Sequence, residues 1–335
     1  MKFPWKAARL LLLAAILILT PLTAFKKTNA AREFPVKSRE YSNVVTIWNI
    51  DTFEGGTGSR SDFLNARAVE FASDGVIYMV VSHTPESAET ALANGNVPAM
   101  ISFGTGLDFI AGKVKKLNVK FAFSGGEIGG VNYAVPWCAG GYFLLRINGD
   151  NRPINKLIVS DGTRNIALGA VYGSVPENVE TITCLEPFDA YCAFVAGEAG
   201  VALLGTQRDI KRLNVRGVNY TATPLERFCD LYQYIAITAE TKETYELAEK
   251  FIEYLISVEV QNKLARIFMR PVVKGATAAE ELSVYNGEKT TATISAFTSA
   301  GVIENLRADL LNSVNERKKS QTFENALKDP RNACK

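Results

Sequence analysis

The segment from Val44 to Arg60, VVTIWNIDTFEGGTGSR, constrains the fold of this chain more than any other. It opens on VVTIW, an apolar and β-branched run that is typical of a strand covered on both faces. A glycine-rich turn, EGGTG, follows, and glycine allows backbone torsions that other residues avoid. A helix then begins that carries Phe63 and Leu64. This order predicts an open α/β sheet, which binds ligands at the carboxyl ends of its strands, beside helix N-termini.

The N-terminus has the pattern of an export signal. Lys2, Lys6 and Arg9 precede an uncharged run from Leu10 to Phe25. This run is shorter than the about 20 residues that a spanning helix needs. We therefore expect a signal peptide or a membrane anchor over residues 1–30, and a polar linker over 31–43. With either alternative, the positive N-terminal residues place the rest of the chain outside the cytoplasm.

The charge of the remaining chain argues against a nucleic-acid partner. Residues 1–30 hold five of the 37 Lys and Arg and no acid, so residues 31–335 carry 32 basic and 35 acidic side chains. They contain no basic stripe with interleaved aromatic residues. The chain has five cysteines, with no CxxC motif, and one histidine, His83. This pattern indicates neither a metal site nor a framework of disulfide bonds. We expect no metal and no cofactor.

Strand-like and helix-like segments alternate along the chain, which predicts a parallel sheet covered by helices. Residues 148–180 read instead as short strands and turns without helical periodicity. Further strands are predicted over Ile77–His83, Val97–Ser102, Val119–Phe123, 131–147 (two strands), Val201–Leu204 and Leu231–Thr238. Helices are predicted over Pro187–Ala199, Lys242–Ser257, Val258–Phe268 and Val302–Ser313.

Four local patterns, in order along about 230 residues, resemble those of the extracellular solute-binding proteins of ABC importers, the group that includes sugar and oligosaccharide binders. The first is the opening segment, and the second is AVPWCAGGYFLL, which is similar to a crossover between lobes. The third is FVAGEAGVALLGTQRDI, and the last is the helix pair AEKFIEYLISVEVQNKLA. The resemblance implies an α/β, two-lobed, periplasmic-binding-protein-like (type II) fold.

One departure from the family concerns the second lobe. The family's helical region after the crossover, with its P-x-T-W-x-E segment, is replaced here by residues 148–180, so we expect a reduced second lobe. The expected first lobe comprises residues 44–118 and 205–275. The expected second lobe, with closing helices, comprises residues 119–204 and 276–315, and a polar tail follows over 316–335.

The resemblance also implies a function. It indicates an extracytoplasmic protein, secreted or held at the membrane by its N-terminal segment, that delivers a small polar solute to ABC permease subunits. A carbohydrate is the expected solute, and closure of two lobes is the expected mechanism. The alternative is a degenerate homologue that acts as a sensor or surface interaction protein without a transported ligand.

Candidate ligand-binding residues follow from the chemistry of sugars, which present flat C–H faces and a rim of hydroxyl groups. Aromatic platforms suit the faces, and carboxylate, amide and guanidinium groups suit the rim. The candidates are Trp48, Asp51 and Glu54 at the first turn, Trp137 and Tyr142 at the crossover, and Gln207, Arg208 and Asp209 after a later strand.

Each candidate also has a structural interpretation. Trp48 and Trp137 could be core residues, Asp51 and Glu54 could cap the following helix, and Arg208 could pair with Asp209. An enzyme is not expected. The glycine turn lacks the P-loop ending and the GxGxxG spacing, and Asp51 and Glu54 are too close in sequence to oppose each other across a sugar.

Overall fold

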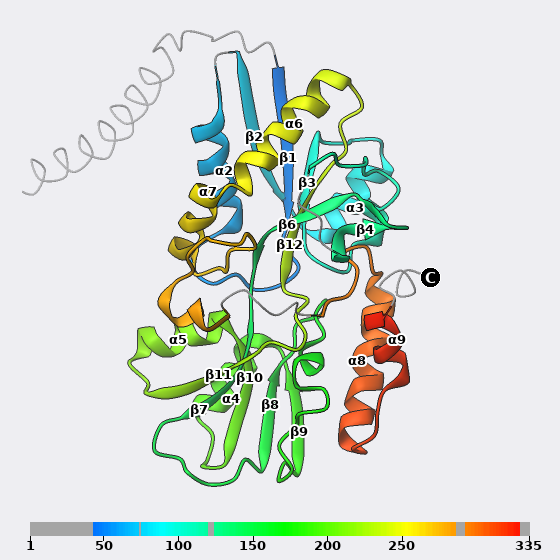
Figure 1. The fold of residues 1–335 in the computed structure, drawn as a ribbon. Coiled ribbons are helices and arrows are strands. Elements are labelled where there is room, and N and C mark those ends of the chain that lie inside the picture. Colours follow the sequence, from blue (N-terminus) through cyan, green and yellow to red (C-terminus); the bar gives the residue numbers. More distant parts are fainter. Residues whose placement is uncertain (1–42, 74, 120–123, 286–291, 329–335) are drawn as a thin grey trace, which may run out of the picture. The chain divides into compact units, whose positions relative to one another are not determined.

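The computed structural model describes residues 43–73, 75–119, 124–285 and 292–328 (Figure 1). The predicted signal or anchor and the linker lie outside these residues, and so does nearly all of the strand predicted over Val119–Phe123. Among the helices that the structure describes, none is both long and apolar enough to span a membrane.

The first lobe is built on a five-stranded sheet with the order β2-β1-β3-β12-β6. Strand β1 pairs in parallel with β2 and β3, whereas β12 pairs antiparallel with β3 and β6. Helices α2 and α6 pack on this sheet (Figure 1). The elements of this lobe are β1 (Asn43–Ile50), α2 (Arg60–Phe71), β2 (Val76–His83), α3 (Pro85–Ala93), β3 (Met100–Phe103), β6 (Ala134–Ala139), β12 (Tyr232–Ile237), α6 (Lys242–Leu255) and α7 (Val258–Asn262).

Local sequence explains the helices of the first lobe. Helix α2 begins where the Ser59 hydroxyl accepts a hydrogen bond from the amide of Asp62, and Thr241 caps α6 in the same way. The helix predicted over Lys242–Ser257 is confirmed as α6, and it buries Ala248, Phe251, Ile252 and Leu255 on one face. The predicted helix from Val258 to Phe268 is shorter, and continues after α7 as the 3-10 helix η4 (Lys263–Ile267).

The second lobe is built on another five-stranded sheet, with the order β11-β7-β10-β8-β9. Strand β8 pairs in parallel with β9 and β10, and β7 pairs antiparallel with β10 and β11. Helix α4 packs against β8, β9 and β10, and α5 packs against β10. The elements are β7 (Tyr142–Ile147), β8 (Lys156–Ser160), η3 (Ala167–Val171), β9 (Thr181–Leu185), α4 (Pro187–Val195), β10 (Val201–Thr206), α5 (Gln207–Arg216) and β11 (Tyr220–Leu225).

The chain crosses between the sheets twice, and the crossings correct the expected lobe boundaries. The first crossing is at Gly140 and Gly141, between β6 and β7, so β6 belongs to the first lobe and not to the second. The second lies between β11 and β12, so residues 205–225, which were expected in the first lobe, belong to the second. The expected boundaries missed this because β11 reaches the second sheet by pairing with β7, about 75 residues earlier in the chain.

The C-terminal part contains more structure than the expected polar tail. Helix α8 (Ala300–Asn315) is followed by α9 (Gln321–Lys328), which packs against α8. Phe323 is fully buried and Ala326 is 6% exposed, so α9 has an apolar face despite its polar composition. The remaining short elements are η1 (Asp108–Ile110), η2 (Ser124–Gly126), β4 (Glu127–Ile128), β5 (Val131–Asn132) and η5 (Glu280–Tyr285).

Candidate functional site

Two neighbouring cavities lie between residues of the two lobes. The outer one has a volume of about 460 Å³, and the inner one of about 20 Å³. We call them together the interlobe cleft, because five residues line both: Phe53, Glu54, Gly162, Asn165 and Pro187. The outer cavity is also lined by Asp51, Thr52, Thr163, Glu186 and Phe188, and the inner one by Tyr142, Ser160, Thr206 and Leu231.

The topology explains why these residues meet. In the first lobe, the loop from Asp51 to Glu54 leaves the carboxyl end of β1. In the second lobe, Ser160 ends β8, and Glu186 lies between the end of β9 and the start of α4. Carboxyl ends of parallel strands share one edge of a sheet, and open α/β sheets bind ligands at that edge.

The walls of the cleft contain polar atoms that are buried without a hydrogen-bond partner. These atoms are Thr52 Oγ1 and Glu54 Oε2 from the first lobe, and Ser160 Oγ and Asn165 Nδ2 from the second. Ser160 is 3% exposed and Asn165 is 5% exposed. Burying such atoms unpaired is costly, and native proteins pair almost all of them with protein, water or ligand. The inner cavity is large enough for one water molecule or one hydroxyl group.

Ion pairs hold two carboxylates of the cleft, those of Asp51 and Glu54. Arg60 Nε lies 3.0 Å from Asp51 Oδ1, and Arg212 Nη2 lies 2.8 Å from Glu54 Oε1. Arg212 Nη1 also lies 3.1 Å from Oδ1 of Asp209, which is completely buried. Burial raises the pKa of Asp209 to about 6, although the Thr206 amide and Arg212 both favour its charged form.

The first turn of α5 connects the second lobe to the loop after β1. Gln207 accepts a hydrogen bond from the Gly141 amide (2.9 Å) and donates one to the Glu54 carbonyl (3.2 Å). Arg208 donates to the Gly56 carbonyl (2.7 Å). Asp209 forms a capping box with Thr206, so it is not paired with Arg208. Gln207 and Arg208 therefore join the lobes, whereas Asp209 bonds only within the second lobe, and none of the three side chains lines the cleft.

Tyr142 lines the inner cavity and is bonded to a buried carboxylate. Its hydroxyl donates to Asp230 Oδ1 (2.7 Å), and the amide of Ile166 donates to Asp230 Oδ2 (2.7 Å). Asp230 precedes β12 at the second crossing, whereas Ile166 belongs to the second lobe. Burial raises the pKa of Asp230 to about 6, and the two donors act in the opposite direction.

The two predicted tryptophans are core residues in this structure, which corrects their proposed role as ligand platforms. Trp137 is fully buried, stacks on Phe63 with 5.7 Å between ring centroids, and donates its indole N–H to Ser102 Oγ (3.0 Å). Trp48 is 8% exposed and lies 4.3 Å from the His83 ring. The reason for Trp137 is that β6 belongs to the first sheet, so its side chain fills the core of that lobe.

Three of the predicted residues, Asp51, Glu54 and Tyr142, line the cleft. The wall from the second lobe was not predicted; its main polar residues are Ser160, Asn165 and Glu186. The segment KLIVSDGTRN carried a usable signal, because an apolar run followed by a polar, glycine-containing turn marks the end of a strand.

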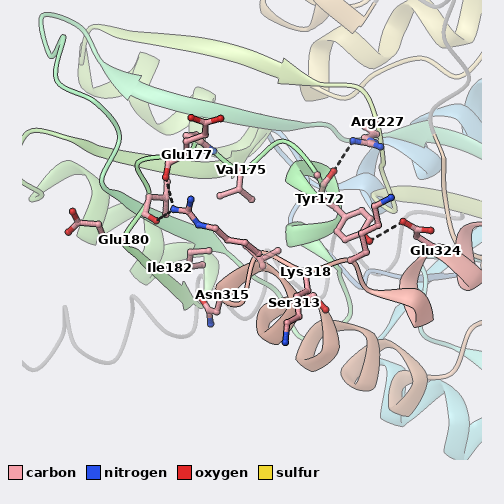
Figure 2. A pocket seen from close by; sticks show the side chains of 16 residues that line it. Tyr172, Val175, Glu177, Glu180, Ile182, Arg227, Ser313, Asn315, Lys318 and Glu324 are labelled. Carbon is pink, nitrogen blue, oxygen red and sulfur yellow. Dashed lines mark hydrogen bonds between the residues drawn. The ribbon is translucent and has the colours of Figure 1, made fainter.

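A separate cavity outside the interlobe cleft has a volume of about 450 Å³. It lies between the segment that precedes β9 and the corner that joins α8 to α9 (Figure 2). The Tyr172 hydroxyl donates to Glu324 Oε1 (3.2 Å), and Arg227 donates to the Tyr172 carbonyl (3.1 Å) (Figure 2). Among the described residues that line it, none has a buried side-chain nitrogen or oxygen without a partner. The interlobe cleft is therefore the better candidate for a ligand site.

Within the described ranges, no three His, Cys, Asp or Glu side chains gather in a way that could hold a metal ion. Cys138, Cys184, Cys192 and Cys229 are free thiols, of which Cys138 and Cys229 are buried and Cys192 is exposed.

Comparisons with known proteins identify the fold. No family model matches the chain, and no curated protein matches it by sequence. Among solved structures, iron-bound HitA from Pseudomonas aeruginosa is similar with a TM-score of 0.54 and 13% identity, over 80% of this chain and 99% of that one. The ferric binding protein from Campylobacter jejuni has a TM-score of 0.54 and 11% identity, over 79% of this chain and 99% of that one. The GacH receptor of Streptomyces glaucescens was solved unliganded and with acarbose. It has a TM-score of 0.53 and 14% identity, over 88% of this chain and 98% of that one. The predicted two-lobed, periplasmic-binding-protein-like α/β fold is thus confirmed.

Proposed function

We propose that this chain is an extracytoplasmic solute-binding protein that holds a carbohydrate or a similar polar solute in the interlobe cleft and delivers it to the permease subunits of an ABC importer. The observation that carries the proposal is that residues of both lobes that line one cleft hold buried polar atoms without a hydrogen-bond partner. A solute that bonds atoms of both lobes stabilises the arrangement in which they are close, which is the principle of lobe closure.

The residues of the cleft suit a hydroxylated organic solute. Glu54 Oε2 accepts hydrogen bonds, Asn165 Nδ2 donates them, and the Ser160 hydroxyl does both. A single solute hydroxyl has the size of the inner cavity. Phe53 and Phe188 line the outer cavity, where they offer apolar area to the C–H faces of a sugar.

The membrane partner and the location are further parts of the proposal. They rest on the positive N-terminal residues and on the resemblance of four sequence patterns to importer components. In this proposal the N-terminal segment is either removed or retained as an anchor, and the two lobes act outside the cytoplasm. The protein binds its solute and does not transform it.

A second candidate function is that of a sensor or surface interaction protein without a transported ligand. It is favoured by the bonds that Gln207, Arg208 and Arg212 make to the loop after β1. These bonds join the lobes without a solute. If they dominate, the radius of gyration measured by small-angle scattering should stay the same when solutes are added.

A thermal-shift screen of the full chain against neutral sugars, amino sugars, polyols and ferric citrate tests the proposal, since a ligand that binds only the folded state raises the melting temperature. The expected result is a shift with at least one hydroxylated organic solute. A shift with ferric citrate alone would contradict the proposed solute class, and no shift with any solute would favour the second candidate.

Two serine variants connect such a shift to the cleft. Ser160→Ala removes a hydroxyl that has no protein partner, so it should weaken solute binding by about fivefold to tenfold and leave the stability unchanged or higher. Ser102→Ala is the matched control. The Ser102 hydroxyl is bonded to Asn49, Trp137 and Gln233, so this variant should lower stability and leave the affinity of the folded protein nearly unchanged.

A further inference from the structure

The charges around the interlobe cleft are unequal. Asp51, Glu54 and Glu186 line the outer cavity, and among its described lining residues there is no lysine, arginine or histidine. Arg60 balances Asp51 from behind the wall. These carboxylates alone would not define a ligand site, but two buried atoms without a hydrogen-bond partner, Ser160 Oγ and Asn165 Nδ2, are independent evidence for one.

Arg212, a second arginine beside the cleft, does not fully balance the acidic side chains near it. Arg212 is shared between Glu54 and Asp209, so one guanidinium serves two carboxylates. Arg208 bonds the backbone carbonyl of Gly56. Counted together, the ionised groups Asp51, Glu54, Asp209 and Glu186 exceed the guanidinium groups Arg60, Arg208 and Arg212 by one negative charge.

That excess charge belongs to Glu186. Glu186 is the N-cap residue of α4, but its side chain forms no capping hydrogen bond. Within the described part of the chain, no basic side chain forms an ion pair with it. Its carboxylate is therefore available to a group that enters the outer cavity.

An aromatic side chain lies two residues from this carboxylate. Phe188 is 58% exposed, which is unusual for a large apolar residue, and it lines the same cavity. Aromatic faces attract cations, and the Arg212 guanidinium already lies 5.4 Å from the Phe188 ring centroid. A carboxylate beside an exposed ring suits an ammonium group attached to a sugar-like body.

We infer that the solute carries one positively charged amino group beside its hydroxyl groups, as an amino sugar or an amino polyol does, and that Glu186 binds this amino group at the edge of the cleft. This inference rests on the proposed function and specifies its solute class. In this arrangement Ser160, Asn165 and Glu54 Oε2 bind the hydroxyl end, and Phe188 covers the apolar face near the amine.

Calorimetry of the full chain with matched pairs of sugars tests the inference. The pairs are glucosamine and glucose, galactosamine and galactose, and the β1,4-linked glucosamine dimer and cellobiose. In at least one pair the amino sugar should bind about fivefold more tightly than its neutral partner, the upper range for a partly exposed charge pair. Added salt should reduce this advantage.

Two variants locate the effect. Glu186→Gln should abolish the preference for the amino sugar while leaving the affinity for the neutral partner nearly unchanged. The control is Glu198→Gln, which changes the net charge equally at an exposed position outside the cleft and should preserve the preference. Equal or tighter binding of every neutral partner, or a preference that Glu186→Gln does not alter, would overturn this inference and leave the proposed function intact. If no sugar of either kind binds, this inference fails, and the proposed function is then decided by the thermal-shift screen, which also contains polyols.

Discussion

Replacing Arg212 should destabilise the second lobe, because its guanidinium neutralises a buried carboxylate. Its guanidinium pairs with Asp209, which is completely buried, and with Glu54, whose side chain is 37% exposed. Removing one partner of a buried ion pair typically costs about 3–5 kcal/mol, because the other charge remains buried and unpaired. Asp209 would keep its hydrogen bond from the Thr206 amide (2.8 Å), and Arg212 is itself 16% exposed. We therefore expect Arg212→Met to lower the free energy of unfolding by about 2–3 kcal/mol.

Urea denaturation followed by circular dichroism measures this loss. Glu54→Gln should cost less than about 1 kcal/mol, since its pair with Arg212 is partly exposed. Arg216→Met is the matched control, because Arg216 lies one turn later on α5 and, like Arg212, has its guanidinium near the Tyr191 ring. The loss in Arg212→Met should shrink as the pH falls from 7 to 5, since protonated Asp209 no longer needs a counter-charge. A loss no larger than that of Arg216→Met, or one that grows on acidification, would refute this reasoning.

Three further predictions follow from buried groups. Trp137→Ala should lower the free energy of unfolding by about 3–5 kcal/mol in urea denaturation, while any solute affinity of the folded protein changes little; a large loss of affinity at unchanged stability would show that the ring contacts the solute. Because the folded-state pKa of Asp230 is about 6, above its unfolded value, Asp230 contributes stability at low pH that is lost as the pH rises from about 4 to about 6. Lowering the pH from 7 to 4 should therefore raise the free energy of unfolding of the wild type by about 2 kcal/mol relative to that of Asp230→Asn. An unchanged difference between the two proteins would contradict the raised pKa. In peptide mapping after brief alkylation of the native protein, Cys192 should be labelled and Cys138 and Cys229 should not.

Local sequence patterns predicted those helices and strands whose burial follows one regular repeat along the chain. The run VVTIW gave β1, which has parallel neighbours on both sides, and the apolar stripe of residues 248–255 gave α6. The crossover at Gly140 and Gly141 was also predicted, from a resemblance that spans it. In each case the determining residues are contiguous, so their periodicity or motif can be read directly.

The errors concern properties that depend on distant partners. Strand β6 joins the first sheet because it pairs with β12, about 100 residues later, and this pairing turns Trp137 into the core. Helix α9 is polar in composition, and only its packing buries Phe323. For Ser160 and Asn165, the sequence KLIVSDGTRN marks the end of a strand, but their burial without partners is visible only in the structure.

The most direct test of the account is hydrogen exchange of the full chain with and without the solute that gives the largest thermal shift. A solute bound between the lobes should protect both walls of the cleft at once. These walls are the loop after β1 at residues 51–54 and the segments 160–165 and 186–190 of the second lobe. Protection confined to one lobe, or to the cavity between residues 172–182 and the α8–α9 corner, would contradict binding between the lobes.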